Sequence, residues 1–311
     1  MSNDDGSNFR KEKMFPPLPL EEWQETKNTL HLYLQIVGKI RLTLFPHLNH
    51  WWHVPLYVSS GGLTTQAIPY GYGNFEIEFD FIEHRLIITT SSGTRRQFSL
   101  QAGLSVSEFY QTIFAHLAAL GIHVKIRAVP YETSSEEPFE TDTQHAAYDK
   151  EYVERFWRIL VGVDAIFEAF RGRFIGKSTP VHLFWHSLDL ALTRFSGRLA
   201  PIRAGAGVVD REAYSHEVIS FGFWVGDDNV PAPAFYSYTA PEPKGLTAEP
   251  LHPEAAYWGS LGGGAIALLM YDEVRKVAEP REVVLEFLES AYRAGANRAG
   301  WDQEQFKLKP L

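Results

Sequence analysis

The chain has no cysteine among its 311 residues. This absence excludes disulfides, thiolate metal ligands and cysteine nucleophiles. It also lacks any apolar run of the ~18 residues that a membrane span needs. Residues 1–15 are rich in Asn, Asp, Ser and Lys, without the apolar segment of a secretory signal. We therefore expect a soluble, cytoplasmic protein of bacterial type that has no membrane partner.

The chain also has fewer basic than acidic residues. The chain carries 29 Lys and Arg against 38 Asp and Glu, a formal net charge of −9, and its basic residues are scattered. A nucleic-acid backbone is a poor partner for such a surface. We expect a small-molecule ligand instead, and the sequence leaves the oligomeric state open.

What the chain does have is a strong apolar pattern, with 45% hydrophobic and 14% aromatic residues. Apolar residues spaced by three and four predict helices, and alternating runs predict strands. Helices are predicted at 20–45, 105–120, 150–170 and 281–297. Strands are predicted at 52–58, 62–68, 74–82, 85–90, 95–100, 122–129, 181–187, 189–195, 214–224, 234–240 and 265–271.

The predicted elements occur twice in the same order, as a helix, a series of strands and a final helix. Residues 181–198 can be laid on residues 52–69 without a gap. This alignment matches His182 with His53, Leu192 with Leu63, and Thr193 with Thr64. We therefore predict an internal duplication.

Successive strands without βαβ alternation indicate antiparallel sheets and an α+β fold of two similar helix–strands–helix halves. The predicted halves cover 20–129 and 148–300, with an acidic, proline-bearing linker at 130–147 and tails at 1–19 and 301–311. Two such halves could join their sheets about a pseudo-twofold axis. Ligand sites often lie where halves meet.

Two histidines interrupt the apolar strand pattern near residue 185. His182 has a counterpart in His53, which favours a structural role, whereas His186 aligns with Tyr57 and is the better catalytic candidate. Residues four apart on a flat strand lie about 13 Å apart, so one metal ion would need a bulge or an early strand end to contact both.

Glu217 is the second anomaly, because it is predicted on an apolar face with Ile219, Phe221 and Phe223. A carboxylate in such surroundings pairs with a cation, binds a metal or has a raised pKa suited to acid–base chemistry. The alternative to catalysis is a buried ion pair with Arg194 or Arg198, which has at least equal weight, because structural ion pairs also perturb pKa values.

Arginine and aromatic residues nearby suggest a pocket for a small anion. A guanidinium group favours bidentate contact with carboxylate or phosphate, and aromatic side chains commonly form pocket walls. The predicted substrate-binding residues are Arg194, Arg198, Trp185 and Tyr214. For each aromatic residue, ordinary core packing is the competing interpretation.

The chain resembles an uncharacterised bacterial family that is known only as a domain of unknown function. The resemblance extends from about Pro16 to Trp301. It rests on motifs that include Asn49-His-Trp-Trp-His-Val-Pro55, His145-Ala-Ala-Tyr-Asp149, Phe174-Ile-Gly-Lys-Ser178 and Tyr214-Ser-His-Glu217. It implies a stand-alone member of that family and supplies no activity, substrate or catalytic assignment.

The leading hypothesis is an enzyme that acts on a small anionic organic molecule in a pocket of the C-terminal half. His186 or Glu217 would be the acid–base group. A divalent metal such as Zn, Fe or Mn, held by His182, His186, His216 and Glu217, is a further hypothesis, since imidazole and carboxylate ligands suit these ions. The alternatives are a non-catalytic ligand-binding protein and a structural protein with an internal polar network.

Overall fold

The structure is a computed structural model that describes residues 14–202, 205–227 and 230–308. Residues 1–13 of the predicted N-terminal tail and 309–311 of the C-terminal tail lie outside the described residues. The helices are α2 (Leu20–Leu44), η1 (Asn49–Trp51), α3 (Val106–Ala119), α4 (Lys150–Arg171), α5 (Val208–Ala213), η2 (Leu246–Ala248), α6 (Tyr271–Arg275) and α7 (Pro280–Ala299).

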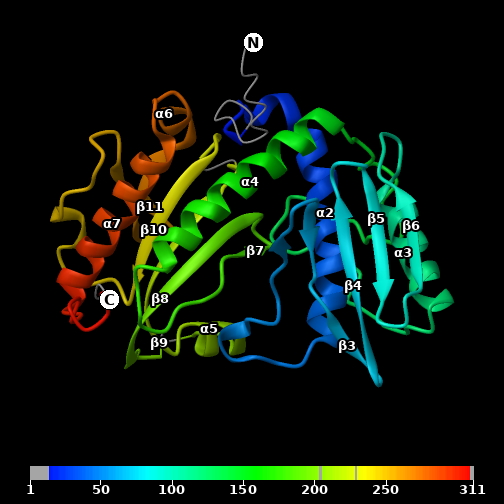
Figure 1. Ribbon diagram of the computed structural model, residues 1–311, viewed down its shortest axis with the longest axis horizontal. Helices are drawn as coiled ribbons and strands as arrows, with labels where there is room; N and C mark the ends of the chain where they lie inside the picture. The colour runs from blue at the N-terminus through cyan, green and yellow to red at the C-terminus, as the bar shows by residue number, and fades with distance from the viewer. Residues whose placement is uncertain (1–13, 203–204, 228–229, 309–311) are drawn as a thin grey trace, which may run out of the picture.

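The strands form two antiparallel sheets, so the fold is α+β as predicted (Figure 1). The first sheet has the order β1-β2-β4-β5-β6, and β3 also pairs with β4. Its strands are β1 (Tyr57–Val58), β2 (Gly62–Thr64), β3 (Ile68–Tyr70), β4 (Gly73–Asp80), β5 (Arg85–Thr90) and β6 (Arg95–Ser99). The predicted alternation of β4 is confirmed, because Phe75, Ile77 and Phe79 are buried.

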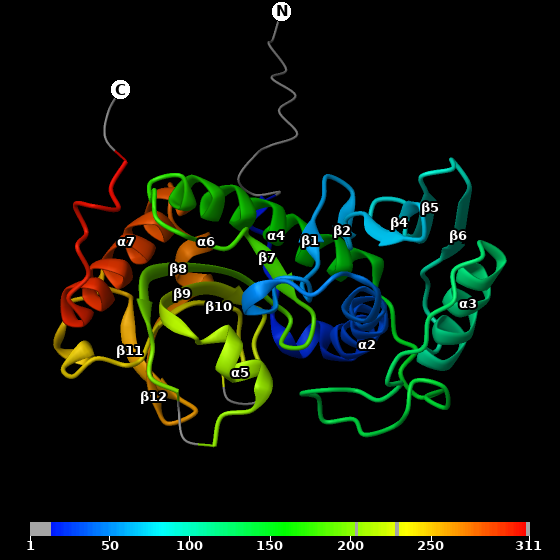
Figure 2. The same cartoon turned by 90° about the horizontal axis from the view of Figure 1, so that it is seen from below.

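The second sheet has the order β11-β12-β10-β9-β8-β7. Its strands are β7 (His182–Phe184), β8 (Asp189–Leu199), β9 (His216–Trp224), β10 (Ala234–Ala240), β11 (Tyr257–Leu261) and β12 (Gly264–Met270). Figure 2 shows that this sheet is strongly curved. Leu190, Phe221 and Phe235 face the main core, so the alternate residues of the same strands face the concave side.

The two sheets meet edge to edge where β1 approaches β7. The N–H of Leu56 donates to the carbonyl oxygen of Leu183 across 2.9 Å, and the N–H of Leu183 donates back across 2.8 Å. One hydrophobic cluster runs through both halves, with contributions from both sheets and from α2, α3, α4 and α7. The sheets are thus two separate sheets linked by one isolated antiparallel bridge between Leu56 and Leu183. The pseudo-twofold axis and the origin of the halves by duplication stay predictions.

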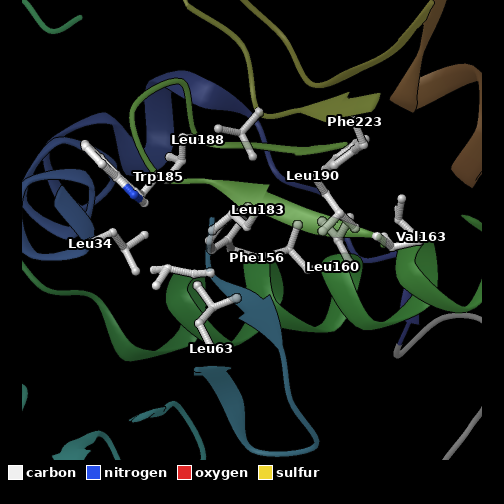
Figure 3. Packing of buried hydrophobic residues seen from close by; sticks show 14 of the residues in the cluster. Leu34, Leu63, Phe156, Leu160, Val163, Leu183, Trp185, Leu188, Leu190 and Phe223 are labelled. Carbon is white, nitrogen blue, oxygen red and sulfur yellow. The ribbon is translucent and has the colours of Figure 1, made fainter. Parts of the chain in front are cut away.

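Helices α2 and α4 cover this junction (Figures 1 and 2). Figure 3 shows side chains of α4, such as Phe156 and Leu160, against Leu183 and Leu190 of the second sheet. Trp185 lies flat on α2, where Gly38 leaves room for its ring: a Cβ at Gly38 would lie 2.3 Å from Trp185. The indole N–H of Trp185 donates to the carbonyl of Val54 across 2.9 Å.

The predicted strand at 122–129 is wrong, because this segment forms neither helix nor strand. Ile122 and Ile126 are buried. The alternation of apolar residues therefore reflects packing against the core, and the segment does not pair with a strand. The segment 130–147 also lacks regular structure, yet it packs beside α2 (Figure 2) and buries Phe139 and Asp142. Strand β11 and helices α5 and α6 had no counterpart in the sequence analysis.

Within the described ranges, no helix combines the length and the apolar character that crossing a membrane requires.

Candidate functional site

A polar pocket of about 430 Å³ opens where four segments meet. Its wall comes from the first half of α2, the irregular segment 130–147, the turn between β7 and β8, and the loop that follows β9. Most of the lining side chains are polar or charged, with Leu32, Leu188, Trp224 and Val225 as the apolar exceptions. The pocket therefore suits a small polar ligand.

The turn after β7 presents His186 to this pocket. Its Nδ1 donates to Oε2 of Glu132 across 2.9 Å, and the imidazole is 29% exposed. The hydrogen bond from His186 is the main reason that the pKa of Glu132 is lowered. Within the described part of the chain, no hydrogen bond involves Nε2 of His186, so this nitrogen remains available for a hydrogen bond to a ligand.

Two side chains of α2 hold the backbone at or next to each member of this dyad. His31 donates from Nε2 to the carbonyl of His186 across 3.0 Å, and burial lowers the pKa of His31 to about 4, so it is neutral near pH 7. One turn further along, Gln35 exchanges two hydrogen bonds with the backbone of Tyr131, at 2.8 and 2.9 Å. The dyad is thus fixed to one rigid helix.

Glu132 has a left-handed backbone conformation, with φ of 54°. Such a conformation costs a residue other than glycine about 1–3 kcal/mol and persists only where surrounding contacts impose it. The paired hydrogen bonds between Gln35 and Tyr131 are such contacts. Backbone strain at a residue that contacts a pocket histidine is typical of functional sites.

A second histidine–carboxylate dyad lines the same pocket. Nδ1 of His145 donates to Oδ2 of Asp142 across 2.7 Å, and His145 is a lining residue of the pocket. The carboxylate of Asp142 is fully buried. The pocket also contains Lys27, whose ammonium group donates to the carbonyl of Gly226 across 2.8 Å.

Glu217 lies away from this pocket, at the start of β9. Its Oε2 accepts from Nη2 and Nε of Arg198 across 2.6 and 2.8 Å, from Ser196 across 2.9 Å, and from the indole of Trp301 across 3.1 Å. Arg198 also donates to the carbonyls of Ala299 and Gly300 at the end of α7. Glu217 is thus paired with Arg198, one of the two arginines named in the sequence analysis, but the pair is not buried, since the Arg198 side chain is 49% exposed.

Arg194 points into the core, where 2% of the residue is exposed. Its guanidinium group lies over the rings of Phe170 and Tyr292, at 3.5 and 4.6 Å from their centroids, and donates to the carbonyl of Phe170 across 2.6 Å. Burial lowers its pKa to about 10. The structure therefore places Arg194 at the C-terminal end of α4 and not among the residues that line the pocket beside α2.

The remaining predicted pocket residues are also occupied by internal contacts. Trp185 is buried against α2. The hydroxyl of Tyr214 shares a hydrogen bond of 2.9 Å with that of Tyr238. Tyr238 in turn stacks on Tyr236, which donates to buried Asp189 across 2.5 Å. The three tyrosines form a network on the concave face of the second sheet.

The four predicted metal ligands are not brought together. His182 is buried between Tyr57 and Phe184, and its Nδ1 is a buried atom without a partner among the described residues. His216 contacts Ser215, while His186 and Glu217 line different pockets. In the described ranges, no group of three or more His, Cys, Asp or Glu side chains could hold a metal ion.

Of the predicted site residues, His186 alone lines the pocket beside α2. Sequence reasoning missed the residues that accompany it, namely Lys27, His31, Glu132, Asp142 and His145. The motif that begins at His145 was one signal for this region, because it belongs to the family resemblance. The other missed residues are far apart in the chain and follow no common spacing.

The fold and the pocket together define an α+β protein with two antiparallel sheets and a polar histidine–carboxylate pocket. A family model described as a family of unknown function (DUF5996) matches residues 15–308. The chain belongs to this family, which confirms the resemblance to a family of unknown function over nearly the whole chain. Searches of curated proteins and of solved structures found no match.

Proposed function

We propose that this protein is an enzyme that performs acid–base catalysis on a small polar molecule in the pocket beside α2. The observation that carries the proposal is the His186–Glu132 dyad in that pocket. A carboxylate on Nδ1 fixes the tautomer of the ring and leaves Nε2 able to take a proton from a ligand. A positioned histidine of this kind contributes about 10²–10⁴-fold to a rate.

The support of the dyad by α2 favours catalysis over simple packing. Acid–base groups act efficiently when neighbouring contacts hold them in one orientation. His31 fixes the backbone of His186, and Gln35 fixes the residue before Glu132. A histidine with only a structural role needs no such independent support on both members of the pair.

The residues that would bind the substrate differ from those predicted from the sequence. Arg194 and Arg198 do not line the pocket, and Lys27 is the ammonium group that does. Hydroxyl and amide side chains from α2 and from 133–135 complete the wall. We therefore propose a small polar molecule rich in hydrogen-bonding groups, with Lys27 beside any anionic part, and a cytoplasmic site of action.

The test is a conversion screen with the purified protein. We would incubate it with a panel of amino acids, hydroxy acids, keto acids and sugars, and follow each compound by mass spectrometry. The wild type is expected to convert at least one compound, and His186→Gln is expected to lose at least about 100-fold in rate. His123→Gln replaces an exposed histidine outside the pocket and is the matched control.

Conversion at equal rates by the wild type and His186→Gln would contradict the proposal. Binding of a panel compound without conversion would favour the alternative function, a non-catalytic ligand-binding protein.

A further inference from the structure

The second dyad of the pocket matches the first in its chemistry. In both, Nδ1 of the ring donates to a carboxylate, at 2.7 Å for His145 and 2.9 Å for His186. The two imidazoles are also similarly exposed, at 28% and 29%. Both histidines line the same cavity, and within the described residues no hydrogen bond involves Nε2 of either ring. The proposed function uses only one of them.

The His145 dyad is fixed by different elements from those that fix His186. Oδ1 of Asp142 accepts the backbone N–H groups of Gln144 and His145, both across 3.1 Å. The backbone carbonyls of Asp142 and His145 accept N–H groups from the first turn of α3, at 2.8 and 3.0 Å. The two histidines are thus held independently, one by α3 and one by α2.

Two independently held imidazoles on one small cavity can divide acid and base work. A neutral imidazole accepts a proton at Nε2, and a protonated one donates a proton there. A ligand that fills the cavity of about 430 Å³ contacts both histidines, because both belong to its lining. The neutral polar residues of the wall, such as Asn28, Ser134 and Ser135, suit a ligand with several hydroxyl groups.

We propose that His145 and His186 are a catalytic pair for the isomerisation of a small α-hydroxy aldehyde or ketone, an inference that rests on the proposed function. Nε2 of His186 takes the proton from the hydroxyl-bearing carbon beside the carbonyl. The electron pair of that C–H bond forms a carbon–carbon double bond. The carbonyl π pair takes the proton from Nε2 of His145, which produces an enediol.

The second half of the reaction restores both histidines. His145 takes the proton of the other hydroxyl group, whose oxygen becomes the new carbonyl. The electron pair of the carbon–carbon double bond then takes the proton from Nε2 of His186, which forms a new C–H bond at the former carbonyl carbon. The product has the same atoms as the substrate, and the reaction needs no oxidant or reductant.

The experiment is isomerisation in D₂O of a panel of short-chain aldoses and ketoses, followed by NMR. The wild type and His123→Gln are expected to form isomerised product with deuterium at the reacting carbon. His145→Gln and His186→Gln are each expected to lose at least about 100-fold in turnover with KM little changed. Circular dichroism and thermal melting of each variant report whether it is folded.

A pH profile separates catalysis by His145 from a structural role. The wild-type rate is expected to be bell-shaped, because one ring must be protonated and the other neutral. His145→Gln is expected to lose one limb of that profile. Asp142→Asn, which keeps the shape of the side chain, is expected to reduce turnover in the same direction and serves if His145→Gln does not fold.

Three other results would contradict the catalytic pair, and one of them would also contradict the proposed function. Turnover by His145→Gln within about twofold of wild type, with a complete bell, overturns the pair and leaves the proposed function standing. Conversion of other compounds without any sugar isomerisation overturns this inference in the same way. Absence of conversion in both panels overturns the inference together with the proposed function.

Discussion

His31 and His182 are buried histidines that stay neutral in the folded protein. Burial lowers the pKa of His31 to about 4 and that of His182 to about 3, from an ordinary value of 6.5. The unfolded chain therefore binds more protons than the folded protein between pH 6.5 and these values. The free energy of unfolding is therefore highest above pH 6.5. It decreases as the pH falls toward 4 for His31 and toward 3 for His182.

We expect the free energy of unfolding to fall by up to about 1.4 kcal/mol per pH unit for each of these histidines. Urea unfolding at a series of pH values below 7 measures this slope. Substitution His182→Gln should remove its part of the slope, whereas exposed His123→Gln should leave the slope unchanged. A stability that is constant down to pH 5 would contradict this explanation.

At the scale of single residues, the chemistry of an anomaly could be recognised from sequence, but its partners could not. Glu217 was predicted to be a carboxylate on an apolar strand face. Its actual partners include Arg198 and Trp301, and the latter lies 84 positions away. Arg194 likewise looked like a ligand-binding cation, because no sequence pattern shows that the rings of Phe170 and Tyr292 enclose it.

At the scale of elements, the approach of α2 to the β7–β8 turn depends on Gly38. A Cβ there would lie 2.3 Å from the indole ring of Trp185, a distance at which one of the two groups must move. Trp185 is buried and bonded to Val54, so it cannot move without loss of packing. Because His186 follows Trp185 directly, the contact also sets the position of the proposed catalytic residue.

We therefore expect Gly38→Ala to destabilise the protein by about 1–3 kcal/mol, although alanine has the higher helix propensity. Thermal and urea unfolding measure the change. Gly207→Ala is the control, since no atom of the described residues lies within 4 Å of a Cβ at that position. An unchanged or raised melting temperature for Gly38→Ala would show that the packing of α2 is less tight than the structure indicates.

Periodicity predicted the long helices and the regular strands well, because these elements bury one continuous face. It failed at 122–129, where alternating apolar residues pack without pairing to a strand. It also had no information on 130–147. The order of that segment comes from distant contacts, such as that between Gln35 and Tyr131, and not from local propensity.

At the scale of the whole molecule, the two sheets share one hydrophobic cluster. Leu63 of the first sheet and Leu183 of the second both lie near α4 (Figure 3), and Leu56 pairs with Leu183 across the junction. The main hydrophobic cluster is continuous across both halves, while a smaller cluster around Trp224 and Tyr236 belongs to the second sheet alone. The halves are therefore expected to fold as one cooperative unit.

We expect a single unfolding transition that coincides when it is followed by far-ultraviolet circular dichroism and by tryptophan fluorescence. Tryptophans lie in both halves, among them Trp23 and Trp224. Two separated transitions would show instead that the halves are independent domains.

The pocket itself belongs to the scale of the whole molecule. Its central residues come from α2, from the segment between α3 and α4, and from the turn after β7. The sequence pointed to His186 because it replaces a tyrosine of the first half. It could not join His186 to Glu132 and His145, because only the folded chain brings these three residues to one cavity.

The rate at which His186→Gln converts the first compound turned over by the wild type tests the central claim most directly. The acid–base account predicts a loss of at least about 100-fold in turnover, with the fold intact and His123→Gln equal to wild type. A His186→Gln protein that turns the compound over at the wild-type rate would contradict it.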